Sequence, residues 1–411
     1  MNEEIKERID MINRGEVPKG YKKTKVGIIP EDWEVKSLDK YAKVIDGDRG
    51  KNYPNQKELV DDGVLFLSTK NIIHSNFDFD EKRFITIDKF NNLSKGKLQK
   101  GDLVITMRGS VGNVALFHGE QYKTAFINAQ MAIIRPFKIE NEFLWFFMNS
   151  NFTQNKIKTM SSGSAQPQLT KKVVEELYIS RPQKKEQQRI AQILSTWDKA
   201  IELKEKLIEE KEEQKKGLMQ RLLTGEVRLP GFEGEWEEVR LKSILDYEQP
   251  DKYIAEDIQE YSIKLIPVLT ANKSFILGST KDVQGIYQDI PVIIFDDFTT
   301  DSKYVDFKFK IRSSAIKLLK SKNDNIDLKF IYELMQLIKF PRGGHKRYYI
   351  SEYQYLRLMI PKYNEQKAIA QILSTADKEI DLLNQELEQL KEQKKGLMQL
   401  LLTGKIRVSL Q

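Results

Sequence analysis

The feature that most constrains this chain is an internal repeat of a long, charged, amphipathic segment. The copy that begins at Pro182 reads PQKKEQQRIAQILSTWDKAIELKEKLIEEKEEQKKGLMQRLLTGEVRL, and the copy that begins at Pro361 reads PKYNEQKAIAQILSTADKEIDLLNQELEQLKEQKKGLMQLLLTGKIRV. They align without a gap at an offset of 179 residues (361 minus 182), and more than half of the aligned positions are identical. Such self-similarity indicates one structural unit that is used twice.

Both copies predict a long helix with a coiled-coil seam, because apolar residues recur at steps of three and four. Each copy follows a proline and ends in Thr-Gly, where glycine can cap a helix. The first seam includes three lysines, so we expect it to pair with the second copy, and a domain between them implies antiparallel helices. The alternative is two amphipathic helices on separate domains. The predicted seam comprises Ile190, Leu194, Trp197, Ile201, Ile208, Leu218, Leu222, Ile369, Leu373, Ile380, Leu383, Leu387, Leu390, Leu397 and Leu401.

Two segments of similar size precede the helices, and each begins with Trp-x4-Leu, at Trp33 and at Trp236. Short β-rich runs follow: LVIT at Leu103 parallels VIIF at Val292, and AIIRP after Met131 parallels AIKLL after Ser314. We therefore predict an α/β (α+β) fold with two twisted-sheet domains separated by two long antiparallel helices. The N-terminal TKVGIIPEDWEVKSL resembles LTGEVRLPGFEGEWEEVRL after the first helix, which predicts a cyclic, pseudo-twofold arrangement.

The predicted boundaries follow from this repeat. A helical extension covers 1–24, the first globular domain 25–181 and the first spacer helix 182–229. The second globular domain covers 230–360 and the second spacer helix 361–411.

Composition excludes several classes of protein. The chain has no cysteine, so it forms no disulfide and offers no thiolate for zinc or catalysis. No apolar run reaches the roughly 18 residues of a membrane helix. The N-terminal segment is charged and has no apolar signal-peptide core, so we expect a cytoplasmic protein without membrane contact. The net charge of +7 fits either a polyanionic partner or an ordinary solvated surface.

Catalytic motifs are missing from the sequence. There is no GxxxxGK(S/T) phosphate loop, no (N/D/S)PP(Y/F) motif and no glycine-rich loop for a methyltransferase cofactor. Asp296 and Asp297 could hold Mg²⁺ in a nuclease, although a turn-forming or cytosine-contacting role is favoured. The three histidines, His74, His118 and His345, lie far apart and show no metal-ligand spacing. The aromatic run FLWFF at 143–147 has helical spacing and predicts core packing rather than base stacking.

Four motifs carry a resemblance to a known family. They are the EQ-x2-IA-x-ILS-x2-D segments at 186–198 and 365–377, the QKKGLMQ-x-LLTG helix ends, KGDLVITMRGSVGN at 100–113 and SGSAQPQLT at 162–170. The chain, over nearly its whole length, resembles the specificity (S) subunit of type I restriction-modification systems. In the second domain PVIIFDDFTTDSKYV and GGHKRY replace the matching motifs, which we interpret as a different DNA half-site.

The resemblance implies a non-catalytic subunit. Each globular domain would be a target recognition domain for one half of a split DNA site, and the helices would set the spacing and dock two methyltransferase (M) subunits. Restriction/motor (R) subunits would join the complex. The methyltransferase would modify adenine N6 with S-adenosylmethionine, and the restriction subunit would use ATP and Mg²⁺, so this chain itself would bind no cofactor or metal.

Polar loops supply the candidate DNA contacts, since Asn and Gln suit adenine and Arg and Lys suit guanine. For each single residue an ordinary exposed loop position is an equal alternative. Two rival functions stay open, namely a stand-alone structural or regulatory DNA-binding protein and a nuclease. The candidates are Ser68, Thr69, Lys70, Asn71, Arg108, Gly109, Ser110, Asn113, Gly163, Ser164, Gln166 and Gln168 in the first domain, and Asn272, Lys273, Thr299, Thr300, Lys303, Arg342, Gly343, Gly344, His345, Lys346 and Arg347 in the second.

Overall fold

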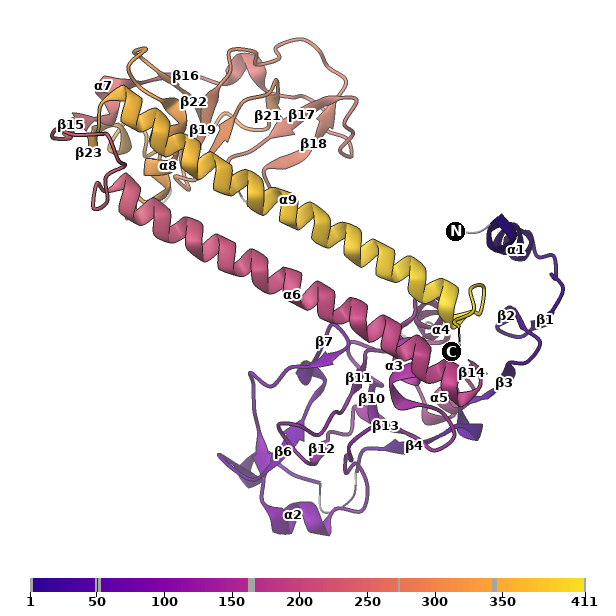
Figure 1. Cartoon of the computed structure of the whole chain (residues 1–411). Helices are drawn as coiled ribbons and strands as arrows, with labels where there is room; N and C mark the ends of the chain where they lie inside the picture. The colour runs from indigo at the N-terminus through magenta and orange to yellow at the C-terminus, as the bar shows by residue number, and fades with distance from the viewer. Residues whose placement is uncertain are drawn as a thin grey trace. The chain divides into compact units, whose positions relative to one another are not determined.

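The computed structural model describes residues 3–48, 50, 53–161, 167–272, 274–341 and 346–409. The chain forms two compact units. Unit 1 consists of Met1–Leu203 with Leu387–Gln411, and unit 2 consists of Lys204–Glu386. Two helices of 40 residues, α6 (Lys184–Leu223) and α9 (Tyr363–Leu402), are continuous through the division, so each contributes one segment to each unit (Figure 1).

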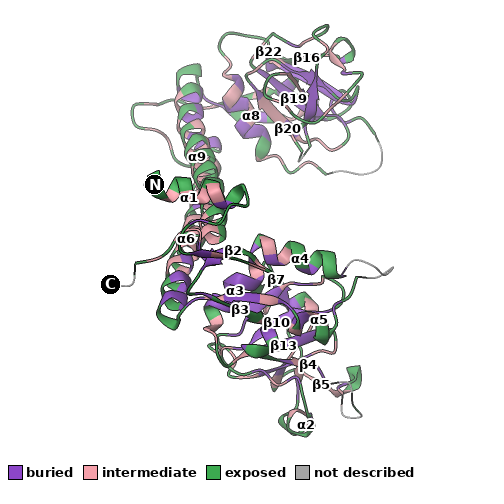
Figure 2. Ribbon diagram, turned by 90° about the vertical axis from the view of Figure 1, so that its right-hand side faces the viewer, coloured by how far each residue is buried: buried purple, intermediate pink, exposed green. Residues whose placement is uncertain are grey.

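Unit 1 is built on two four-stranded sheets. The antiparallel sheet has the order β11-β10-β13-β4, from Val114–Leu116, Leu103–Thr106, Met131–Pro136 and Ala42–Asp46. The second sheet has the order β12-β6-β9-β5, from Ala125–Ile127, Val64–Leu67, Phe84–Ile85 and Leu59–Val60, and its β12 and β6 are parallel. Every residue of β10 is buried, as an uninterrupted apolar run predicts for a strand covered on both faces (Figure 2).

Shorter elements complete unit 1. Strands β1 (Tyr21–Thr24) and β2 (Gly27–Pro30), β3 (Glu34–Ser37) and β14 (Tyr178–Arg181), and β7 (Ile72–Ile73) and β8 (Asn76–Phe77) form three antiparallel pairs. The helices are α1 (Glu3–Asn13), α2 (Ile87–Asn92), α3 (Asn141–Asn149), α4 (Asn151–Ser161) and α5 (Lys171–Glu175), with 3-10 turns at Leu38–Lys40, Gln56–Glu58 and Thr69–Asn71. Helix α3 buries Phe143, Phe146 and Phe147 in the core, which confirms core packing for the aromatic run.

Unit 2 repeats the plan of unit 1. Its antiparallel sheet has the order β16-β22-β19-β20, from Leu245–Glu248, Ile316–Ser321, Val292–Asp296 and Ser302–Val305. Its second sheet has the order β18-β17-β21, from Ile276–Thr280, Ile266–Leu269 and Lys310–Ile311, with β17 and β21 parallel. Strands β15 (Glu237–Arg240) and β23 (Arg357–Ile360) pair, and helices α7 (Leu241–Ile244) and α8 (Leu328–Gln336) and 3-10 turns Asp251–Tyr253 and Tyr353–Tyr355 complete it.

Helices α6 and α9 pack together within each unit. In unit 2 the Lys204 Nζ lies 2.8 Å from Glu386 Oε2, and Lys211 Nζ lies 2.6 Å from Glu379 Oε1. Lys215 pairs with Asp377 further along. Residue numbers rise on α6 as they fall on α9, so the helices are antiparallel there. The three lysines that interrupt the first apolar pattern therefore form ion pairs with α9.

The predicted seam residues differ in burial. Leu218 is 39% exposed, and Trp197, Ile201, Ile380, Leu383, Leu390 and Leu397 are half-buried. The buried members are Ile190, Leu194, Ile208, Leu222, Ile369, Leu373, Leu387 and Leu401.

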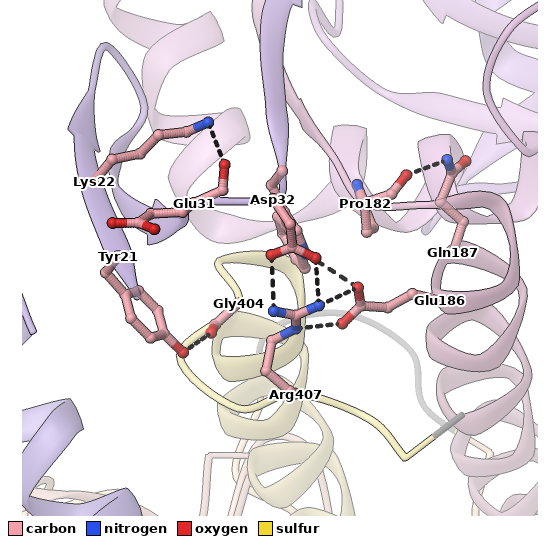
Figure 3. Close-up of polar contacts among 10 residues, drawn as sticks. Tyr21, Lys22, Glu31, Asp32, Pro182, Glu186, Gln187, Gly404 and Arg407 are labelled. Carbon is pink, nitrogen blue, oxygen red and sulfur yellow. Dashed lines mark hydrogen bonds and ion pairs between the residues drawn. The ribbon is translucent and has the colours of Figure 1, made fainter. Parts of the chain in front are cut away.

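The C-terminal tail closes on the N-terminal segment within unit 1. The Arg407 guanidinium donates from Nε to Glu186 Oε1 at 2.7 Å and also bonds both Asp32 oxygens at 2.8 and 2.9 Å (Figure 3). The Tyr21 hydroxyl donates to the Gly404 carbonyl at 2.8 Å. This contact agrees with the cyclic arrangement that the similar flanking sequences predict.

Unit 2 contains the matching contact, between an arginine that follows one long helix and the glutamate at the start of the other; we call this contact the joint of each unit. Arg228, which is 179 residues before Arg407, donates to Glu365 Oε1 at 2.6 Å and Oε2 at 2.7 Å. The next glutamine of each repeat also has a fixed partner: Gln187 Nε2 donates to the Pro182 carbonyl at 2.7 Å, and its counterpart bonds the carbonyl of Pro361 at 2.8 Å. The repeated Glu-Gln pair is therefore explained by the joint between helix and domain.

Candidate nucleic-acid interface

Four loops of unit 1 meet at one edge of its sheets. Asn128 donates its backbone N–H to Leu67 O at 2.9 Å, because the parallel strands β6 and β12 end side by side. Met107 then donates to Gln130 O at 2.8 Å and accepts from Leu169 N at 2.9 Å. These three bonds bring together the loops 68–71, 107–113, 128–130 and 167–169, which we call edge 1.

The loop 107–113 has a defined shape. The Thr106 hydroxyl donates to the Ser110 carbonyl and accepts from Asn113 N at 3.0 Å. Gly109 has φ +77 and Gly112 has φ +89, a region that side chains disfavour. A Cβ on Gly112 would also lie 2.7 Å from Ile157 Cγ2. The glycines therefore permit the tight return that leaves residues 108–110 exposed.

Edge 1 holds most of the described candidates of the first domain. Arg108 and Gln168 are exposed and form a backbone bridge, so two separate sequence motifs become neighbours. Lys70 is exposed and lies 3.4 Å from Glu81 Oε2, and Ser68, Thr69 and Asn113 are half-buried. Gly163, Ser164 and Gln166 lie outside the described residues.

Asn71 has a structural role in this loop. It is 5% exposed, its Oδ1 accepts from Ser68 N at 2.9 Å, and its Nδ2 donates to Asp78 O at 3.0 Å and Glu81 O at 2.9 Å. Because the amide is occupied by these bonds, we leave Asn71 out of the DNA-contacting set.

Sequence reasoning missed the loop 128–130, although Gln130 is exposed at the centre of edge 1. The only signal was the polar NAQ between the apolar runs AFI and MAII. Asp48 lies beside this loop, since a Cβ on Gly47 would contact the Asn128 carbonyl at 2.5 Å. Backbone N–H donation from Gly50 is the largest cause that lowers the pKa of Asp48 to about 2, ahead of hydrogen bonds from Ser94.

Unit 2 forms the corresponding edge with three equivalent backbone bonds. Arg312 N donates to Leu269 O at 3.1 Å, Asp297 N donates to Ala315 O at 2.9 Å, and Tyr348 N donates to Asp297 O at 2.8 Å. The loops 270–272, 297–301, 312–315 and 346–349, as far as they are described, form edge 2. The two edges therefore share a backbone frame and differ in side chains.

The described candidates of the second domain lie at or next to edge 2. Asn272 and Lys303 line one open pocket with Thr300, whose φ is +59. The Thr299 hydroxyl donates to Asn272 Oδ1 at 3.3 Å. Lys346 and Arg347 are exposed. Lys273, Arg342, Gly343, Gly344 and His345 lie outside the described residues.

Edge 2 also exposes residues that sequence reasoning missed. Arg312, Ser313 and Ser314 are exposed in the turn before β22, and the Arg347 guanidinium lies 6.0 Å from the ring of Phe298. A polar RSS between two strands was the available signal. Guanidinium, amide and hydroxyl groups at one edge can donate hydrogen bonds to phosphates and to base edges, and the amide and hydroxyl oxygens can also accept hydrogen bonds from base edges.

The Asp296–Asp297 pair is occupied by internal contacts. Asp296 Oδ1 accepts the backbone N–H groups of Phe298 and Thr299 at 2.9 Å each, which is a turn-forming arrangement. Asp297 is fully buried and faces Lys317, whose Nζ lies 3.5 Å from its Oδ2. Within the described ranges no group of three or more acidic or histidine side chains is placed to hold a metal ion. In the same ranges no helix is long and apolar enough to cross a membrane.

Known proteins resemble this chain in sequence and fold. The family model "Type I restriction modification DNA specificity domain" matches residues 30–213 and 233–392. A type I restriction enzyme specificity subunit of Escherichia coli is 46% identical over 148 residues, which cover 34% of this chain and 36% of that protein. A type I restriction enzyme specificity subunit of Methanocaldococcus jannaschii is 24% identical over 415 residues, covering 92% of this chain and 94% of that protein.

The fold has a solved counterpart. The crystal structure of a type I restriction-modification S subunit from M. genitalium matches with a TM-score of 0.56 at 16% identity, and the match covers 92% of this chain and 97% of that chain.

Proposed function

This chain belongs to the type I restriction-modification DNA specificity subunits, and we propose that edge 1 and edge 2 each recognise one half of a split DNA site. The family is non-catalytic within its complex, and recognition of DNA is its role. The observation that carries the proposal is that the same three backbone hydrogen bonds occur at edge 1 and at edge 2. The two edges therefore hold different side chains on equivalent backbone positions. Base contacts specify a site while phosphate contacts position the protein, so this arrangement suits two different half-sites.

The partners of the chain are part of the proposal. We expect two methyltransferase subunits, which methylate adenine N6 with S-adenosylmethionine, and restriction subunits that use ATP and Mg²⁺. These cofactors would belong to the partners. The family membership supports this composition. A cytoplasmic location stays a prediction from the sequence.

We further propose that α6 and α9 set the spacing between the half-sites. Two observations support this spacing role: each helix is 40 residues long, and lysine–carboxylate ion pairs join the two helices. Insertion of four residues into each helix adds about 6 Å at about 1.5 Å per residue. The non-specific spacer should then grow by one or two base pairs, at about 3.4 Å per pair, with both half-sites unchanged. A change in the half-site sequences would contradict a spacing role.

Methylome sequencing tests the whole proposal. A host that carries this chain with its cognate methyltransferase should acquire adenine methylation at one split motif. Exchange of residues 36–181 for another recognition domain should change one half of that motif and leave the other half unchanged. Absence of methylation together with tight binding by the chain alone would favour the stand-alone DNA-binding protein. Mg²⁺-dependent cleavage by the purified chain would favour the nuclease.

A further inference from the structure

Asp297 lies at the point where three loops of edge 2 meet. Its backbone N–H donates to the Ala315 carbonyl at 2.9 Å, and its carbonyl accepts from Tyr348 N at 2.8 Å. Its side chain makes a further bond, since Oδ1 accepts from Tyr349 N at 2.7 Å. One residue therefore links its own loop to the loops 312–315 and 346–349, which carry the exposed Arg312, Lys346 and Arg347.

The Asp297 carboxylate also forms an ion pair with a buried lysine. Lys317 in β22 is 0% exposed, as is Asp297, and its Nζ lies 3.5 Å from Asp297 Oδ2. The same Nζ donates to Gln249 Oε1 at 2.8 Å. Because an unpaired charge is costly inside a protein, each member of the pair restricts the other to a narrow range of positions. The carboxylate is thus fixed between β22 and the loop at 348–349.

Unit 1 has the same backbone frame without this ion pair. Met107 occupies the position of Asp297, since both donate to and accept from the equivalent loops. Ala132 occupies the position of Lys317, because Ile105 pairs with Ala132 as Phe295 pairs with Lys317. The fold is therefore complete with apolar residues at both positions. The Asp297 carboxylate adds a side-chain hydrogen bond to the 346–349 loop, and the thioether of Met107 provides no equivalent carboxylate in unit 1.

We propose that Asp297, held by Lys317, is a positioning residue that sets the loops of edge 2 in the arrangement that discriminates its DNA half-site. The inference rests on the proposed function. Asp297 is fully buried and acts on DNA through the loops that it joins, so its loss should reduce discrimination at one half-site only. This role differs from the metal-binding and cytosine-contacting roles that the sequence left open.

The variant Asp297→Asn tests the role, because asparagine retains an oxygen acceptor for Tyr349 N and removes the charge that faces Lys317. Binding is measured for the complex with its methyltransferase, on the methylated motif and on duplexes with single base changes in either half. We expect discrimination to fall at least tenfold in the half read by unit 2. Discrimination in the other half should stay within twofold.

Asp282→Asn is the matched control. It removes the carboxylate partner of Lys310, whose side chain is 3% exposed, in the same unit. Asp282 follows β18 at the end where Thr280 pairs with Ile266, away from edge 2. This control should lower thermal stability and leave the base preference unchanged. An equal effect of both variants on the two half-sites would overturn the positioning role.

A second variant decides the question if Asp297→Asn does not fold. The double variant Asp297→Met with Lys317→Ala installs the residues of unit 1 and leaves no unpaired charge. It should still fold, because no buried charge is left unpaired, and should lose at least tenfold discrimination in one half-site. A stable double variant with wild-type discrimination would refute the inference alone. A wild-type complex without any split-site preference would refute the proposed function as well.

Discussion

Substitution of Arg228 by alanine isolates the energetics of the unit 2 joint. The guanidinium donates from Nε and NH2 to the two oxygens of Glu365, at 2.6 and 2.7 Å. Glu365 is 2% exposed, and within the described residues its carboxylate has no other hydrogen-bond donor. Arg228→Ala would therefore leave a buried carboxylate without a donor, between the start of α9 and the segment that follows α6.

The size of the effect follows from the burial of the pair. Removal of one partner of a buried ion pair costs about 3–5 kcal/mol. Because the Arg228 side chain is 29% exposed, water can partly replace it, and we reduce the expected loss to about 2–3 kcal/mol. For a unit of this size each kcal/mol lowers the melting temperature by about 2–4 °C. The variant should then melt roughly 5–10 °C below the wild type.

Differential scanning calorimetry at neutral pH measures this shift. The control is Arg357→Ala, which breaks an ion pair with Glu238 in which the side chains are 58% and 53% exposed. That variant should lose at most about 1 kcal/mol. Adding Glu365→Gln to Arg228→Ala should recover part of the loss, since a neutral amide is less costly to bury unpaired. Equal melting temperatures for the two arginine variants, or no recovery in the double variant, would refute the reasoning.

The folded-state pKa of Asp48, about 2 against the ordinary 3.8, makes it stabilising above about pH 4 by roughly 2 kcal/mol. Asp48→Asn should therefore have a lower free energy of unfolding than the wild type at neutral pH, and urea unfolding should show that this difference disappears as the pH falls toward 2. A difference that stays constant with pH would contradict the prediction. Gly225→Ala should cost about 1–2 kcal/mol from its φ of +75. Gly404→Ala should cost roughly 2 kcal/mol more than Gly225→Ala, because the new Cβ would clash with Pro30. Equal melting temperatures for the two glycine variants would contradict this prediction.

Much of the fold was predictable because long periodic segments and uninterrupted apolar runs are strong local signals. The comparison of AIIRP with AIKLL found the matching strands β13 and β22, although it aligned Ala132 with Ala315. The equivalent backbone bonds instead match Gln130 with Ala315, so the sequence comparison is two residues out of register. A slip of two keeps each side chain on its original face of the sheet, and hydrophobicity alone therefore did not reveal it.

The candidate site was predicted less completely. Local composition predicted the loops with glycine or paired polar residues, such as those of Arg108 and Arg347, and their contact with DNA stays a prediction. The turns at 128–130 and 312–314 were missed because they are short and join two buried strands. Their place at the edges follows from the parallel pairing of the strand before each turn, β12 with β6 and β21 with β17. The assignment of Asn71 to DNA contact also failed to anticipate that its amide is satisfied within the loop.

The sequence by itself determined the repeat, the two helices, the unlike domains and the absence of recognisable catalytic motifs. Each of these can be recognised from local periodicity, from short motifs or from residues that recur at an offset of 179 positions. Tertiary structure alone decided which groups meet. The bidentate contact of Arg407 with Glu186 joins residues 221 positions apart, and the buried pair of Asp297 and Lys317 depends on the register of two strands. Hydrogen bonds and ion pairs require distances near 3 Å, and no spacing along the chain specifies those distances.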